Sequence, residues 1–169
     1  SKSTAIDSTV VDTDGIYRMT GPARIFYSEK EAMRAVKGLT KNSIQAGDVI
    51  VLCGRGPMGS GMEEVAQITL ALKHLSWGKH VALLTDARFS VVSTGACIGH
   101  ISPEALAGGP IGKLREGDII EIKINRRKLI GTINFIGQAG KIITPNEGKA
   151  VLDQRSAPSE LQADPRLPE

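Results

Sequence analysis

Two short apolar segments, residues 49–52 and 81–84, enclose a glycine-rich loop and a stretch with helical periodicity. A continuous apolar run of this length is typical of a β-strand buried on both faces. Between the runs, mostly apolar side chains recur at helical spacing at Met62, Val65, Ala66, Ile68, Thr69, Leu72 and Leu75. The order strand, glycine loop, helix, strand predicts a βαβ unit with a right-handed crossover. Ligands of such units bind at the carboxyl ends of the strands.

Further elements flank this unit. Ser28 and Glu31 form a capping box, which predicts a helix over residues 29–37 after a short strand at 24–26. Residues 118–124 and 128–135 have β-like composition on either side of a polar turn, which predicts an antiparallel hairpin. In the crossover helix, we expect Glu63 and Glu64 in the first turn, where negative charge suits the helix dipole. The predicted fold is mixed α/β.

The two ends of the chain differ from its middle. Residues 1–17 are polar and irregular, and we interpret them as a lead-in segment. Residues 18–144 are expected to form one domain, because 169 residues suit a single globular domain. After Pro145 the apolar periodicity is lost and three further prolines interrupt the chain, so residues 145–169 are predicted to be an extended or disordered tail.

Composition excludes several classes of protein. A net charge of +3 and 4% aromatic residues supply neither the basic surface nor the stacking platform of a nucleic-acid binder. No apolar stretch approaches the roughly 20 residues of a membrane span. Cys53 and Cys97 are too few for a disulfide scaffold and lack zinc-site spacing, so a cytoplasmic protein is expected.

The first glycine cluster, Gly54 to Gly61, offers backbone N–H groups at a helix N-terminus. Such a loop suits an anion such as phosphate or carboxylate. No Gly-Lys-Ser/Thr follows it, so it is not a Walker A loop, and a dinucleotide fingerprint lacks its acidic residue. The alternative is a turn that needs glycine for its geometry alone.

The second loop, residues 85–100, concentrates reactive side chains after a buried strand. Ser90 or Cys97 could act as a nucleophile with His100 as base, but the spacing matches no GxSxG elbow. Each residue also has an explanation without chemistry. Ser90 could be a turn hydroxyl, Cys97 a small buried residue and His100 a structural histidine.

Several motifs together resemble the C-terminal domain of the dihydroxyacid dehydratase and phosphogluconate dehydratase family. They extend over roughly residues 18–137 and are Thr20-Gly21-Pro22-Ala23-Arg24, Gly59-Ser60-Gly61-Met62-Glu63-Glu64, Thr85-Asp86-Ala87-Arg88-Phe89-Ser90, Gly95-Ala96-Cys97-Ile98-Gly99-His100-Ile101-Ser102-Pro103-Glu104-Ala105, Gly108-Gly109-Pro110-Ile111 and Glu116-Gly117-Asp118. The segment from Cys53 to Glu64 is most similar to the sugar-acid branch, in particular to the D-xylonate dehydratase type.

The resemblance implies a swivelling-type β/β/α domain, with a mixed barrel-like sheet flanked by helices. It also implies a hydro-lyase that removes water from a 2,3-dihydroxy carboxylate, with an iron–sulfur cluster and Mg²⁺ as cofactors. The family's base falls on Ser90 and its magnesium ligand on Glu64. Arg88, Ser93, Thr94 and Gly95 are expected to support the substrate or the loop. The family usually has glycine after the base, where this chain has Val91.

The cluster ligands are expected in the family's N-terminal domain and not in this chain, so this chain alone is predicted to be inactive. The expected partners are a sugar-acid substrate, the protein's own N-terminal domain and further copies in a homo-oligomer, with no nucleic acid and no membrane. Two alternatives stay open. One is a non-catalytic module that binds small carboxylates or another protein. The other, within the family, is a dihydroxyacid dehydratase of branched-chain amino acid synthesis.

Overall fold

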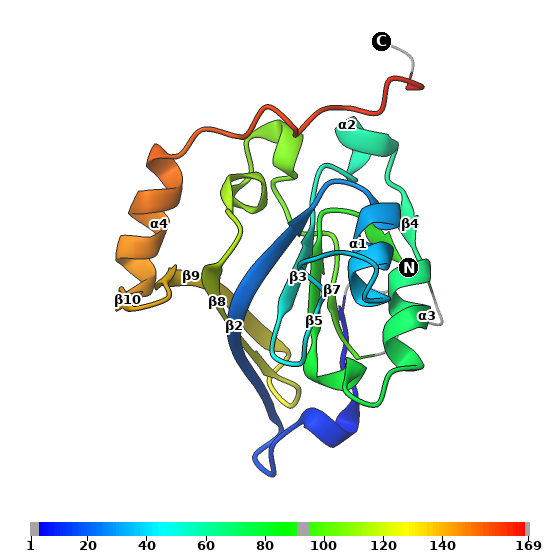
Figure 1. Ribbon diagram of the computed structural model, residues 1–169. Helices are drawn as coiled ribbons and strands as arrows, with labels where there is room; N and C mark the ends of the chain where they lie inside the picture. The colour runs from blue at the N-terminus through cyan, green and yellow to red at the C-terminus, as the bar shows by residue number, and fades with distance from the viewer. Residues whose placement is uncertain (1–3, 91–94, 168–169) are drawn as a thin grey trace.

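The computed structural model describes residues 4–90 and 95–167, which form an eight-stranded mixed sheet with helices against it (Figure 1). The strand order is β1-β7-β5-β3-β2-β8-β9-β10. The strands are β1 (Thr4–Ala5), β2 (Ile16–Phe26), β3 (Val49–Leu52), β5 (Ala82–Thr85), β7 (Ala96–Ile98), β8 (Asp118–Asn125), β9 (Ile130–Gln138) and β10 (Lys141–Ile142). The expectation of a mixed sheet flanked by helices is confirmed.

The central strands are parallel and the outer ones antiparallel. β2, β3, β5 and β7 pair in parallel, and β3 and β5 are the two strands of the predicted βαβ unit. β8 and β9 form the predicted antiparallel hairpin. β2 joins the two parts, because its residues 16–22 pair with β8 and its residues 23–26 pair with β3.

The sheet separates two apolar cores. Ile50 and Leu52 of β3 face α1 (Glu29–Val36) and α3 (Gln67–Lys73), which cover one side of the parallel strands. Val49 and Val51 face the other side, where they share a cluster with β8, β9 and Leu152 of α4 (Pro145–Gln154). All four β3 side chains are fully buried. This double burial explains why β3 reads as a continuous apolar run.

Helix α1 begins where the capping box predicts, since the Ser28 hydroxyl accepts the Glu31 N–H at 3.3 Å.

The crossover helix is shorter than expected. Gly61 and Met62 both have positive φ, 68° and 65°, which breaks the helical path. Glu63 and Glu64 therefore do not lie in a helical turn. Glu64 belongs instead to β4 (Glu64–Val65), which pairs in parallel with β6 (Arg88–Phe89) in a second, two-stranded sheet.

Both ends of the chain are more ordered than expected. Residues 4 and 5 add β1 to the sheet edge beside β7, and a 3₁₀ turn follows at Ser8–Val10, so the lead-in is part of the fold. The prediction of an extended or disordered tail is wrong for Pro145–Gln154, which forms α4. A capping box starts this helix, because Thr144 and Glu147 bond each other's backbone N–H groups. Residues 155–167 follow without regular structure.

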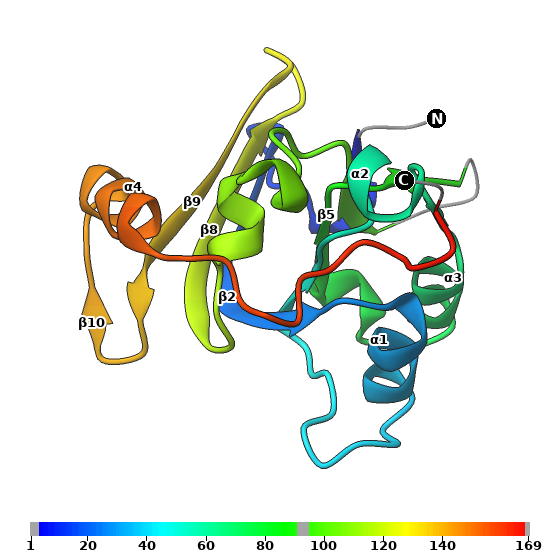
Figure 2. The ribbon, with the colours of Figure 1, turned by 90° about the horizontal axis from the view of Figure 1, so that it is seen from above.

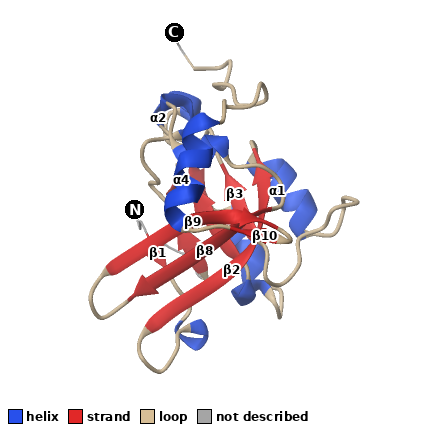
Figure 3. Cartoon of the chain, turned by 90° about the vertical axis from the view of Figure 1, so that its left-hand side faces the viewer, coloured by secondary structure: helices blue, strands red, loops and turns tan. Residues whose placement is uncertain are grey.

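The remaining elements are short. They are α2 (Pro57–Ser60) within the glycine loop and the 3₁₀ turns Gly78–His80, Ala105–Ala107 and Pro110–Lys113. Seen from above, α2, the 3₁₀ turns Ala105–Ala107 and Pro110–Lys113 and the C-terminal segment gather over the sheet edge where β3 and β5 end (Figure 2). Figure 3 shows the β8–β9 hairpin extending away from this edge, beside β2. In the part of the chain that is described, no helix is long and apolar enough to cross a membrane.

Candidate active site

Asp86 organises the carboxyl ends of β3 and β5. Its carboxylate is 2% exposed and accepts the N–H groups of Gly54 at 3.0 Å, Arg55 at 2.9 Å and Ala105 at 3.0 Å. These three bonds join the glycine loop to the turn that follows β7. Sequence reasoning did not assign Asp86 to the site. A carboxylate directly after a buried strand was the available signal, because such a group requires partners inside the protein.

The glycine loop's N–H groups are already occupied by the protein's own acceptors. Asp86 takes those of Gly54 and Arg55, and Glu104 takes that of Met58 at 3.1 Å. Backbone carbonyls of the same loop take the N–H groups of residues 59–62. The expectation that this loop binds an external anion is therefore wrong for these groups. The anions it holds are the side chains of Asp86 and Glu104.

Glu64 and Arg88 lie side by side on β4 and β6, as partners in the parallel register. One Glu64 carboxylate oxygen lies 3.9 Å from an Arg88 guanidinium nitrogen, and both side chains are about half exposed (48% and 47%). Because side chains alternate along a strand, Ser90 falls on the same face as Arg88. The Ser90 N–H donates to the Val65 carbonyl at 3.3 Å, which continues the pairing. The segment after the glycine loop and the start of the second loop thus lie side by side here.

Glu63 has a different environment from its neighbour. Its carboxylate accepts the Arg55 Nε–H at 2.6 Å, and the Arg55 side chain is 14% exposed. The Arg55 carbonyl in turn accepts the Glu63 N–H at 3.2 Å and the Ser60 hydroxyl at 2.9 Å. Glu63 therefore stabilises the loop, whereas Glu64 is available to a ligand on the open face.

The remaining expected loop residues divide into two groups. Gly95 has a φ of 98°, and its carbonyl accepts the Asp7 N–H at 2.8 Å, so it supports the loop from the side of the lead-in. Val91, Ser93 and Thr94 lie outside the described residues. Their expected contribution to the substrate or the loop stays a prediction.

Glu64 suits a magnesium ligand, because an exposed carboxylate oxygen is the donor that this ion prefers. Among residues 4–90 and 95–167, no group of three or more His, Cys, Asp or Glu side chains could hold a metal ion. Further ligands would therefore have to come from outside this part of the chain.

The two thiols do not suit an iron–sulfur cluster. Cys53 and Cys97 are each 1% exposed and belong to the two separate apolar cores. Burial raises the pKa of each thiol to about 12, so both stay protonated at neutral pH. Cluster ligands are thiolates, and these two residues act as small apolar side chains.

A cavity of about 770 Å³ lies elsewhere, between β1, β7 and the β8–β9 hairpin. Ile98, Ile130 and Ile133 are among its lining residues, and none of the residues discussed above as the candidate site lines it. Its lining also includes polar side chains such as Asn125, Arg126 and Thr132, and it is separate from the Glu64–Arg88 pair.

Fold and site together define an α/β domain that presents a carboxylate, a guanidinium and a hydroxyl group on one strand pair. Residues 2–141 match the family model "Dihydroxy-acid/6-phosphogluconate dehydratase C-terminal". The chain belongs to this family.

Individual relatives agree. D-xylonate dehydratases YagF and YjhG of Escherichia coli are 56% and 55% identical to the chain, over 99% of its length. The dihydroxy-acid dehydratase of Methanococcoides burtonii is 48% identical over 74% of the chain. These alignments cover 25%, 26% and 23% of the three relatives, so the chain spans about a quarter of their length.

Proposed function

We propose that this chain is the C-terminal part of a sugar-acid dehydratase whose substrate is D-xylonate. The overall reaction removes the C2 proton and the C3 hydroxyl group of a 2,3-dihydroxy carboxylate as water. The resulting enol tautomerises to a 2-keto-3-deoxy acid. The observation that supports this proposal is the pairing of Glu64 and Arg88 on neighbouring parallel strands, with Ser90 directly after the second strand. The chain that carries them matches two D-xylonate dehydratases over 99% of its length.

Each of the three residues has a role in this proposal. Ser90 accepts the proton from C2, and Arg88 provides a cation beside it that favours the negative charge developing on the substrate. Glu64 would hold Mg²⁺, which supplies Lewis acidity at the substrate oxygens when it is bound. The iron–sulfur cluster would be bound by the rest of the protein, since Cys53 and Cys97 do not suit it.

The proposal extends to architecture and partners. We assign the domain to the swivelling β/β/α type, which is supported by the mixed sheet that curves from the parallel strands into the β8–β9 hairpin. Its main partner would be the N-terminal domain of the same protein, because the relatives are about four times as long as this chain. Copies of the whole protein would assemble as a homo-oligomer.

The decisive experiment uses the full-length protein. Ser90→Ala should lower kcat by roughly 10²- to 10⁴-fold, because a general base contributes about that much. Metal and cluster content and the KM for D-xylonate should stay close to wild type. Solvent-deuterium exchange at C2 of the substrate should slow by the same factor, whereas Ser93→Ala should have a far smaller effect. Wild-type exchange at C2 in Ser90→Ala would refute the assignment of the base.

A further inference from the structure

The segment after α4, residues 155–167, crosses the sheet edge and lies over the glycine loop (Figure 1). Leu161 anchors it there with 8% of its surface exposed. A Cβ atom at Gly54 would lie 2.7 Å from one Leu161 methyl carbon, and a Cβ atom at Gly112 would lie 3.0 Å from the other. Since contacts this short are repulsive, a side chain at either glycine would force Leu161 to shift.

Beyond Leu161, the segment makes polar contact with the loop. The Asp164 N–H donates to the Gly59 carbonyl at 2.7 Å. The Asp164 carboxylate is 12% exposed and accepts the Arg166 Nε–H at 2.9 Å. Hydrogen bonds from Arg166 lower the pKa of Asp164, and the charge of Arg55 adds to this effect. Asp164 is therefore charged and is held by the Arg166 guanidinium group.

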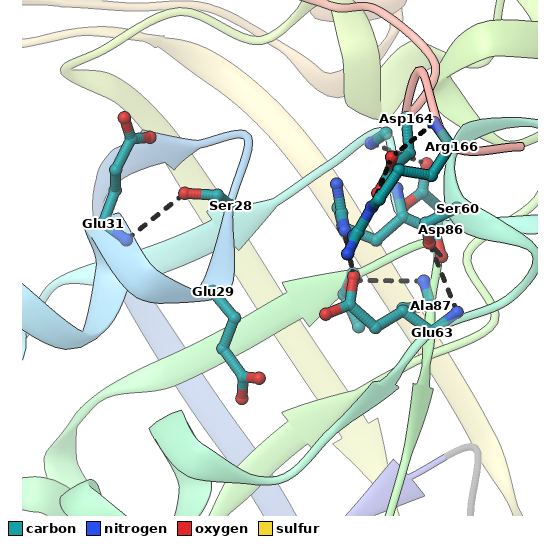
Figure 4. Close-up of polar contacts among 12 residues, drawn as sticks. Ser28, Glu29, Glu31, Ser60, Glu63, Asp86, Ala87, Asp164 and Arg166 are labelled. Atoms are coloured by element: carbon teal, nitrogen blue, oxygen red, sulfur yellow. Dashed lines mark hydrogen bonds and ion pairs between the residues drawn. The ribbon is translucent and has the colours of Figure 1, made fainter.

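These side chains form a row of alternating charge: Arg166, Asp164, Arg55 and Glu63. Figure 4 shows Asp164 and Arg166 beside Ser60 and Glu63. The next residue after Glu63 is Glu64, the candidate metal ligand. Arg166 is 86% exposed at the outer end of this row. Its guanidinium group presents N–H donors to solvent, on the segment that lies over the glycine loop.

The comparisons place this segment outside the part common to the family. The family model ends at residue 141, before α4 begins. The two D-xylonate dehydratases match 99% of the chain, whereas the dihydroxy-acid dehydratase of Methanococcoides burtonii matches 74%. Residues 155–167 thus follow the common domain in a region that the chain shares with D-xylonate dehydratases.

We propose that residues 155–167 determine substrate specificity, with Asp164 and Arg166 binding the distal hydroxyl groups of a sugar acid. This inference rests on the proposed dehydratase function. A sugar acid carries hydroxyl groups beyond C3, and a carboxylate beside a guanidinium offers them both an acceptor and donors. A branched dihydroxy acid carries methyl groups there, which cannot hydrogen-bond to either side chain, so it gains nothing from this contact.

The test compares two substrates in the full-length protein: D-xylonate and the branched acid 2,3-dihydroxyisovalerate. Arg166→Met keeps a long side chain. Because Arg166 is exposed, the substitution should not unfold the protein. It should lower kcat/KM for D-xylonate by about 10-fold, mainly through KM, and leave the value for the branched acid within about twofold. The matched control is Arg126→Met in the exposed turn of the β8–β9 hairpin, which should change neither value.

A second variant, Leu161→Ala, removes the anchor and leaves Asp164 and Arg166 intact. It should speed hydrogen exchange of the Asp164 amide and change the ratio of the two kcat/KM values in the same direction. Equal losses on both substrates, or no loss, in Arg166→Met would overturn the inference.

Two results separate this inference from the proposed function. If the wild-type protein dehydrates neither substrate, the proposed function is wrong. In that case, calorimetry of D-xylonate binding to the wild type and to Arg166→Met tests the inference alone. Equal affinities in that measurement would overturn it. A wild-type protein that prefers the branched acid would overturn the inference and leave the dehydratase assignment in place.

Discussion

Asp118 and Arg155 form a buried ion pair that ties the first residue of β8 to the residue that follows α4. The Asp118 carboxylate is fully buried and also accepts the Arg115 N–H at 2.8 Å. The Arg155 guanidinium lies 4.8 Å from the centre of the Phe135 ring. This pair fixes the start of the C-terminal segment to the sheet.

Arg155→Met should destabilise the 169-residue chain by about 3 kcal/mol, because it leaves the Asp118 charge buried without its partner. Urea unfolding followed by circular dichroism measures the change. The matched control is Arg18→Met, which removes exposed ion pairs with Asp12 and Asp14 and should cost far less. Equal costs for the two variants would contradict the structural role of Arg155.

Glu63 and Glu64 should respond differently to removal of their charge. In the full-length protein, Glu64→Gln should raise the Mg²⁺ concentration for half-maximal activity by about 10-fold or more, since it weakens a metal ligand. Glu63→Gln should leave the Mg²⁺ requirement nearly unchanged, because that carboxylate is engaged by Arg55. Magnesium titration of activity measures both, and equal shifts would refute the assignment of Glu64.

Glu29 of α1 caps the neighbouring helix α3. One of its carboxylate oxygens accepts the N–H groups of Ala66, Gln67 and Ile68, at 2.7 to 3.2 Å. Glu29→Ala should therefore destabilise the chain by about 1 to 2 kcal/mol and speed hydrogen exchange at these three amides. Glu31→Ala, two residues later in the same helix, should have a much smaller effect on them. Unchanged exchange at residues 66–68 in Glu29→Ala would refute the cap.

The buried thiols make stability fall at alkaline pH. The pKa of each of Cys53 and Cys97 is raised from 9.0 to about 12, so between these values the unfolded chain loses protons that the folded chain keeps. The full stability is present below pH 9 and is lost progressively as the pH rises toward 12, by about 1.4 kcal/mol per pH unit for each thiol. Urea unfolding at pH 8 and pH 10 measures this loss. Cys53→Ala should halve the thiol contribution, and an undiminished loss in that variant would contradict the assignment.

Much of the sheet could be predicted from the sequence, because local signals and tertiary structure agree there. The apolar runs of β3 and β5 reflect burial on both faces, and Ser28 marks the start of α1. The prediction for the tail relied on its prolines and did not use the capping box before α4. Thr144 and Glu147, with Pro145 at the first helical position, were the signal for α4.

The site was harder to predict than the fold. Helical spacing from Met62 onward placed Glu64 in a helix, since periodicity does not reveal the left-handed conformations of Gly61 and Met62. The partners of the glycine loop could not be found either, because Asp86 and Glu104 lie 32 and 46 residues from the amides they accept. Such pairings depend on the strand order, which motif spacing does not contain.

β2 limits how this domain can move. Its 11 residues bond β8 along one half and β3 along the other, so the parallel strands and the hairpin share one continuous backbone. Any rotation between those two parts would break a ladder of inter-strand hydrogen bonds within that strand. The eight-stranded sheet therefore moves as one rigid body, so a force applied to the β8–β9 hairpin also displaces β3 and β5, whose carboxyl ends carry the glycine loop and Asp86.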